Sequence, residues 1–115
     1  MKPYLFVFEA QPKPDNPQTK DIGGACASII VFSESINCAR ETSVRFIDQY
    51  GWQAKEEQYA LELPPSQIAH LDTVLSSVYR KAEMNGISAQ FDAWPKKDRP
   101  GVYSFETLMI PRKKE

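Results

Sequence analysis

Three residues of this sequence carry side chains that could together perform nucleophilic catalysis. Cys38 could act as the nucleophile, His70, the single histidine, as the base, and Asp72 as the group that orients the imidazole. Cys38 falls in the first turn of an expected helix, where the helix dipole favours a thiolate. It has no polar cluster around it, and His70 lies beside an apolar stripe, so a small Cys-dependent enzyme is an alternative and not the favoured interpretation. We assign no catalytic residue and expect alanine at position 38 or 70 to leave biological activity unchanged.

The cysteines and the histidine also predict no metal site and no cofactor. Cys26 and Cys38 stand twelve residues apart, and with one histidine they match no usual zinc spacing. Two cysteines in apolar surroundings are too few for a disulfide framework, which favours a reducing compartment. The apolar run Tyr4 to Phe8 is too short for a signal peptide or a membrane span. We therefore expect a cytoplasmic protein without membrane association.

The charge distribution suggests a second kind of candidate site. The 115 residues carry 14 basic and 15 acidic side chains, a net charge of −1. Up to Trp94 there are 8 basic and 12 acidic residues, whereas from Pro95 onward there are 6 and 3. A solvated basic tail accounts for this, and nucleic acid is not the expected partner. Weak nucleic-acid binding through the 96–114 region stays as an alternative, with the binding residues Lys96, Lys97, Arg99, Arg112, Lys113 and Lys114.

The stretch from Ala25 to Leu63 predicts the unit on which the other elements pack. Ala25 to Phe32 is apolar on both faces, as expected of a central strand. A helix follows near residues 35–50, beginning at a serine cap and ending at Gly51. The strand from Trp52 to Leu63 changes its apolar phase, so we expect a bulge between Lys55 and Gln58. Because Trp52 begins a strand directly after the helix, we expect this strand to run parallel to the strand Ala25 to Phe32 and to be joined to it by a right-handed crossover.

The remaining segments complete a single domain, 1–115. A strand covers Tyr4 to Ala10, with its aromatic rings packed in the core and not stacked on bases, and a long proline-rich loop covers 11–24. A second helix is expected near 66–85, closed by Gly86, and strands follow at 87–93 and 102–110. Residues 111–115 form a frayed basic tail. The order of elements predicts an α+β fold, a ferredoxin-like sandwich with one five-stranded mixed sheet and two helices on one face.

Spacing and turn residues in the first half of the chain carry a resemblance. Ala10, Pro12 and Pro14 end the first strand, Gly23-Gly24-Ala25 opens the second, and Gly51-Trp52 follows the first helix. Together they resemble a group of small uncharacterised bacterial proteins of unassigned function. This resemblance implies no catalytic residues.

The two apolar faces of the expected sheet indicate how the protein acts. If both helices cover one face, Ile30 and Phe32 cannot be buried together with Ile29 and Val31 within one chain. We expect a small non-enzymatic interaction or regulatory module that works through self-association, as a homodimer, or through a protein partner. Alternatively, the 11–24 loop covers the face as a lid and the chain is a monomer.

Overall fold

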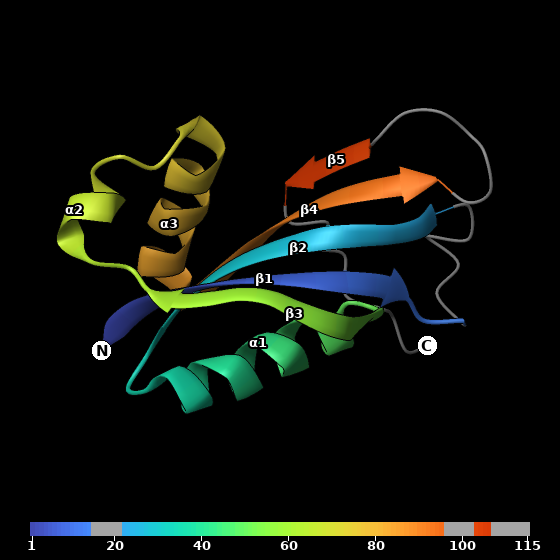
Figure 1. Cartoon of the computed structure of the whole chain (residues 1–115), viewed down its shortest axis with the longest axis horizontal. Helices are drawn as coiled ribbons and strands as arrows, with labels where there is room; N and C mark the ends of the chain where they lie inside the picture. Colours follow the sequence, from blue (N-terminus) through green and yellow to red (C-terminus); the bar gives the residue numbers. More distant parts are fainter. Residues whose placement is uncertain (15–21, 96–102, 107–115) are drawn as a thin grey trace.

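The computed structural model describes residues 1–14, 22–95 and 103–106. Four strands form an antiparallel sheet in the order β3-β1-β2-β4, and a short strand, β5, pairs with the outer edge of β4 (Figure 1). The elements along the chain are β1 (Lys2–Pro12), β2 (Ile22–Ser33), α1 (Ile36–Gln49), β3 (Trp52–Glu62), α2 (Pro65–Ile68), α3 (Thr73–Asn85), β4 (Ile87–Pro95) and β5 (Tyr103–Glu106).

The hairpin β1–β2 occupies the middle of the sheet, and its two apolar faces determine the rest of the architecture. Successive side chains of a strand point to opposite faces. Phe6 and Ile29 are fully buried on one face, together with Ala39 and Ile47 of α1. Leu5 and Ile30 are buried on the other, together with Val78 and Ala82 of α3. We call these the α1 face and the α3 face, and Figure 1 shows the two helices on opposite sides of the sheet.

The predicted ferredoxin-like sandwich is therefore wrong, although an α+β fold fits. The sheet is not mixed, because all its pairs are antiparallel. Three helices are present among the described residues, one of them short, and the two long helices do not share a face. The physical reason is that β1 and β2 are apolar on both sides, so each side needs its own cover.

The parallel orientation predicted for β2 and β3 is present in the sheet. β2 and β3 run parallel to each other, since each is antiparallel to β1, but β1 lies between them. The predicted central strand is confirmed, because β2 has β1 on one side and β4 on the other. The expected loop at 11–24 is shorter at both ends, since β1 continues to Pro12 and β2 begins at Ile22.

The helix ends agree with the residues predicted to form them. The Ser35 hydroxyl accepts a hydrogen bond from the Cys38 N–H at 3.2 Å at the start of α1. Gly51 and Gly86 adopt φ of 90° and 89° at the ends of α1 and α3, a conformation that glycine enters at the lowest cost. The single helix predicted at 66–85 is wrong, however: it is divided into α2 and α3, and Asp72 caps the second piece by accepting the Leu75 N–H at 2.8 Å.

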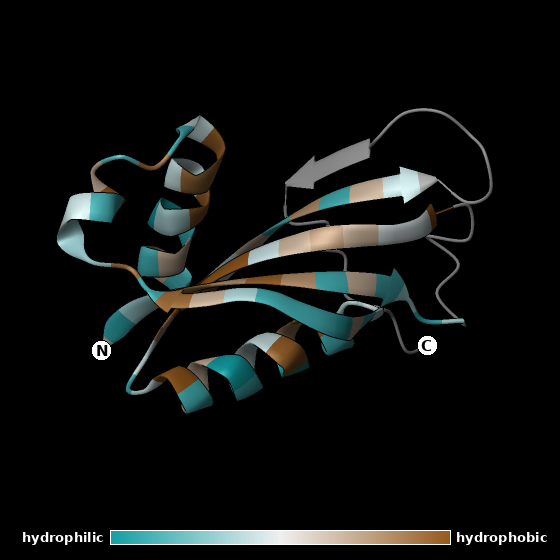
Figure 2. Cartoon of the chain, in the orientation of Figure 1, coloured by the Kyte–Doolittle hydropathy of each residue, from teal (hydrophilic) through white to brown (hydrophobic). Residues whose placement is uncertain are grey.

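The bulge predicted in β3 is confirmed and is in fact double. Val7 pairs with Tyr59 and Phe8 with Glu57, so Gln58 has no partner in β1. Glu9 pairs with Glu56 and Ala10 with Ala54, so Lys55 also has no partner in β1. Two extra residues let β3 return its aromatic and apolar residues to the sheet after the polar run that Figure 2 shows in teal.

Candidate interaction face

Cys38, His70 and Asp72 do not meet in the structure. Cys38 lies exposed on α1, on one side of the sheet, whereas His70 and Asp72 lie next to α2 and α3 on the other. Nδ1 of His70 lies 2.8 Å from the Ser66 carbonyl oxygen. A carbonyl can only accept, so Nδ1 carries the proton and donates it there. The Asp72 carboxylate is engaged as a helix cap. His70 and Asp72 therefore make local hydrogen bonds, and neither lies on the side of the sheet that carries Cys38.

The basic residues proposed for nucleic-acid binding, at 96, 97, 99 and 112–114, lie outside the described residues. The aromatic residues of β1 belong to the described part of the chain, and they are not available for base stacking. Tyr4, Phe6 and Phe8 are between 0% and 4% exposed, packed on the α1 face. Among the described residues, no group of three or more histidine, cysteine, aspartate or glutamate side chains could hold a metal ion. No helix of the described part is long and apolar enough to cross a bilayer.

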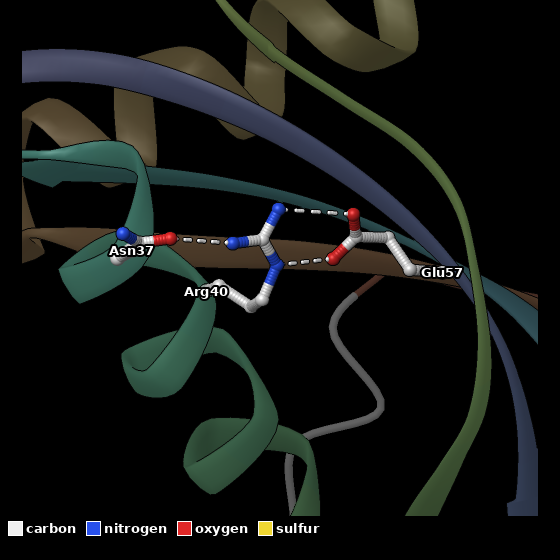
Figure 3. Close-up of polar contacts among 3 residues, drawn as sticks. All are labelled: Asn37, Arg40 and Glu57. Carbon is white, nitrogen blue, oxygen red and sulfur yellow. Dashed lines mark hydrogen bonds and ion pairs between the residues drawn. The ribbon is translucent and has the colours of Figure 1, made fainter.

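A guanidinium–carboxylate pair joins α1 to the edge of the sheet (Figure 3). Nε of Arg40 donates to one oxygen of Glu57 at 2.6 Å and a terminal nitrogen donates to the other at 3.1 Å. Asn37 accepts from the remaining nitrogen at 2.9 Å, and the guanidinium carbon lies 5.6 Å from the centre of the Phe6 ring. The hydrogen bond with Glu57 raises the pKa of Arg40. Three of the five N–H groups of this guanidinium thus have partners inside the chain, and the pair fastens α1 to β3.

The α3 face differs from the α1 face because its helix covers only one end of the sheet. The apolar cluster under α2 and α3 reaches Leu5 and Ile30 and goes no further along β1 and β2. Beyond it, Figure 1 shows the four strands continuing past α3 with no helix on that side. We call this part of the sheet the open face; its residues are Val7, Glu9, Gly24, Cys26, Ser28, Glu56, Tyr59, Gln90, Asp92 and Trp94. Its exposure is uneven, since Glu56 and Tyr59 are exposed whereas Gln90 is only 5% exposed.

Strand register arranges the open face in rows across the sheet. Tyr59, Val7, Ser28 and Gln90 are successive partners in one row. Glu56, Glu9, Cys26 and Asp92 are successive partners in the next, which we call the carboxylate row. Directly opposite residues of an antiparallel pair have Cβ atoms about 4.5–5.5 Å apart. The carboxylate row thus places three acidic side chains and a thiol next to one another on four adjacent strands.

The pKa of the Cys26 thiol is affected by the carboxylates of this row. Burial raises the pKa of its thiol, and the charges of Asp92 and Glu9 raise it further. The thiol is therefore held in its protonated form, unlike the thiolate needed by a nucleophilic cysteine. A hydrogen bond of 3.3 Å from Gln90 Nε2 to Asp92 Oδ1 joins the two rows.

Two aromatic side chains lie on the open face, on either side of the carboxylate row. Tyr59 is 51% exposed and Trp94 is 37% exposed. Trp94 pairs with Gly24, and a Cβ atom at position 24 would lie 2.5 Å from its Cζ2 atom. The indole therefore occupies the space above this glycine, which fixes it against the sheet. Gly24 lies inside β2, and the absence of a side chain there makes room for the indole.

The buried polar atoms do not provide another site. Three of them lack a hydrogen-bond partner among the described residues: Ser43 Oγ, Trp52 Nε1 and Ser88 Oγ. The first two belong to the packed α1 face, where Trp52 contacts Phe91 with ring centres 5.1 Å apart. Ser88 is 3% exposed and pairs with Ile30, in the row next to the open face.

In the sequence, Cys26 belongs to an apolar strand and has no zinc-type spacing to Cys38, and neither feature indicates the open face. One feature of the sequence could have indicated the open face: the alternate positions of β1 change from apolar to charged, since Leu5 and Val7 are followed by Glu9. Comparison of the chain with known protein families, with curated proteins and with solved structures gives no match.

Proposed function

We propose that this protein is a small non-enzymatic interaction module that binds a protein partner, or a second copy of itself, on the open face. The observation that supports this most directly is that the apolar cluster under α3 ends at Leu5 and Ile30 on β1 and β2, while these strands continue past α3 (Figure 1). The part of the sheet beyond α3 presents Tyr59 and Trp94, both more than a third exposed. Exposed aromatic residues on a rigid surface are typical centres of protein–protein interfaces.

The residues that support a partner in the structure differ from those that suggested one in the sequence. Ile30 and Phe32 need no second chain, because α3 covers them: Ile30 belongs to its cluster, and the Phe32 ring lies 5.6 Å from that of Tyr79. The proposal rests instead on the half of this face that α3 leaves uncovered. The β3 edge of the sheet is a poorer binding surface, since β3 carries two bulges and a charged run, Lys55 to Glu57, which hinder pairing with another strand.

Photo-crosslinking in the native host tests this proposal. The full chain would carry p-benzoylphenylalanine in place of Tyr59 or, as the control, in place of Val74. The two positions have matched exposure, 51% and 49%, but Val74 lies on α3, away from the open face. We expect a discrete adduct from position 59 and none from position 74, with mass spectrometry identifying its second component. Equal crosslinking from both positions, or none from position 59, would contradict the proposal.

A further inference from the structure

We infer that Asn85, the last residue of α3, is a site of spontaneous deamidation, and that opening of the helix end sets the rate of this modification. Asn85 and Gly86 are both exposed, and they connect α3 to β4. The group that reacts is the side-chain amide of Asn85, and the only co-reactant is water. The site lies outside the open face and does not depend on the proposed function.

The reaction begins when the backbone nitrogen of Gly86 attacks the side-chain carbonyl carbon, Cγ, of Asn85. A new N–C bond closes a five-membered succinimide ring, the bond from Cγ to Nδ2 breaks, and the proton lost by the backbone nitrogen leaves with the amide as ammonia. Water then opens the ring at either of its two carbonyl groups. Opening at Cγ gives aspartate. Opening at the backbone carbonyl gives isoaspartate, whose main chain runs through Cβ and Cγ and is one carbon longer.

Gly86 offers little steric hindrance to this attack. Among the described residues, apart from its own neighbours in the chain, no heavy atom lies within 4 Å of the point that a Cβ atom on Gly86 would occupy. The nitrogen therefore has no side chain beside it, and the ring has space to form. Asn37 is the internal comparison, since it is also exposed and helical but precedes Cys38, whose side chain hinders the same attack.

The folded end of α3 slows the reaction. The Gly86 N–H donates to the Ala82 carbonyl oxygen at 2.7 Å, so the nitrogen is held away from Cγ and keeps its proton. Ring closure also needs the ψ angle of Asn85 to leave its helical value. Both changes require the last turn of α3 to open, and exposed helix ends open at low cost. Loss of one such hydrogen bond corresponds to a reaction about three- to tenfold slower than in the unfolded chain.

Isoaspartate at position 85 would weaken the cover that α3 gives to the sheet. The Gly86 carbonyl oxygen accepts the Phe32 N–H at 2.9 Å, which joins the α3–β4 connection to β2. The additional backbone carbon would displace this carbonyl, and a carboxylate at the C-terminal end of a helix is unfavourable. Since Leu5 and Ile30 pack under α3, the modified chain should melt a few degrees below the unmodified one.

Incubation of the full chain at pH 8 in ¹⁸O-labelled water tests the site, with peptide mapping by mass spectrometry. Electron-transfer fragmentation then distinguishes isoaspartate from aspartate. We expect ¹⁸O to enter residue 85 of the folded chain, none to enter Asn37 over the same time, and the reaction to be about three- to tenfold faster in concentrated urea. Asn85→Gln, which would have to close a larger ring, should give no product at this position. Equal incorporation at both asparagines, or none at position 85 of the folded chain, would overturn the site.

Met84→Gly tests whether opening of the helix end sets the rate. Met84 is 82% exposed, so glycine weakens the last turn of α3 without changing the core. We expect this variant to react about three- to fivefold faster than the original chain in buffer and at the same rate in urea.

Hydrogen exchange at the Gly86 amide measures the same opening without a substitution, and it decides the matter if circular dichroism shows Met84→Gly to be unfolded. The protection of this amide should equal the ratio of the deamidation rates in urea and in buffer. An unchanged rate in folded Met84→Gly, or protection that differs severalfold from that ratio, would show that opening of the helix end does not set the rate.

Discussion

Gly24 and Trp94 are partners across β2 and β4, and the indole ring of Trp94 fills the space that a side chain at position 24 would need. The contact joins one end of the central hairpin to β4. It also sets the position of an aromatic ring on the open face.

We predict that Gly24→Ala destabilises the protein by about 1–3 kcal/mol, because the new methyl group displaces the indole or the backbone. Thermal or urea unfolding would measure the loss. In a Trp94→Ala background the same substitution should cost much less, since the atom with which it clashes is gone. Equal costs in the two backgrounds would show that the two residues are not coupled.

A second prediction concerns the break between α2 and α3. Asp72→Ala should destabilise the protein by about 1 kcal/mol, because the Leu75 N–H loses its acceptor at the start of α3. Asp72→Ser, which keeps an acceptor at the cap, should lose only a small part of this. Urea unfolding of the three proteins under the same conditions compares them, and a serine variant as unstable as the alanine variant would rule out the capping role.

A third prediction follows from the thiol of Cys26. Its pKa in the fold is raised above the ordinary value of 9.0, so the folded chain keeps the proton at pH values where the unfolded chain has released it. The stabilisation that this gives is fully present below about pH 9 and is lost as the pH rises through the folded pKa. We expect the free energy of unfolding to fall above about pH 9, and to fall less steeply in Cys26→Ala.

Alkylation by iodoacetamide supplies an independent measurement of the same effect. Cys26 should react more slowly than the exposed Cys38 at pH 8, since only the thiolate reacts. Replacing Glu9 with Gln should speed the reaction of Cys26, because one of the charges that raise its pKa is gone. An unchanged rate in this variant would contradict the electrostatic contribution of Glu9.

The sequence predicted those features of the fold that depend on neighbouring residues. Ser35 and Gly51 mark the ends of α1, Gly86 ends α3, and the change of apolar phase after Trp52 indicates the bulges in β3, because caps and alternation are local properties. The face that each helix covers is not a local property. It depends on which edge of the β1–β2 hairpin each helix leads to, and this is determined by the packing of the whole chain.

The open face could not be predicted for the same reason. Glu9, Cys26, Glu56 and Asp92 are spread over more than eighty residues and come together only through three strand registers. Each of them alone appears as an ordinary polar position of a strand. By contrast, Cys38 and His70, which the sequence singles out by residue type, lie on opposite sides of the sheet.

The last prediction tests the division of the core between two faces. Ile29 and Ile30 are adjacent in β2 and both fully buried, but Ile29 packs on the α1 face and Ile30 under α3. If both helices covered one face, one of these side chains would lie on an uncovered surface and its truncation would cost little. Because both side chains are buried in the structure, truncating either one would leave a cavity. Ile29→Ala and Ile30→Ala should therefore each destabilise the protein by about 2–5 kcal/mol. Val44→Ala, at a position 38% exposed on α1, should cost less than about 1 kcal/mol and serves as the control. Urea unfolding of the three variants measures these differences, and an Ile30→Ala variant as stable as Val44→Ala would show that α3 does not cover its face of the sheet.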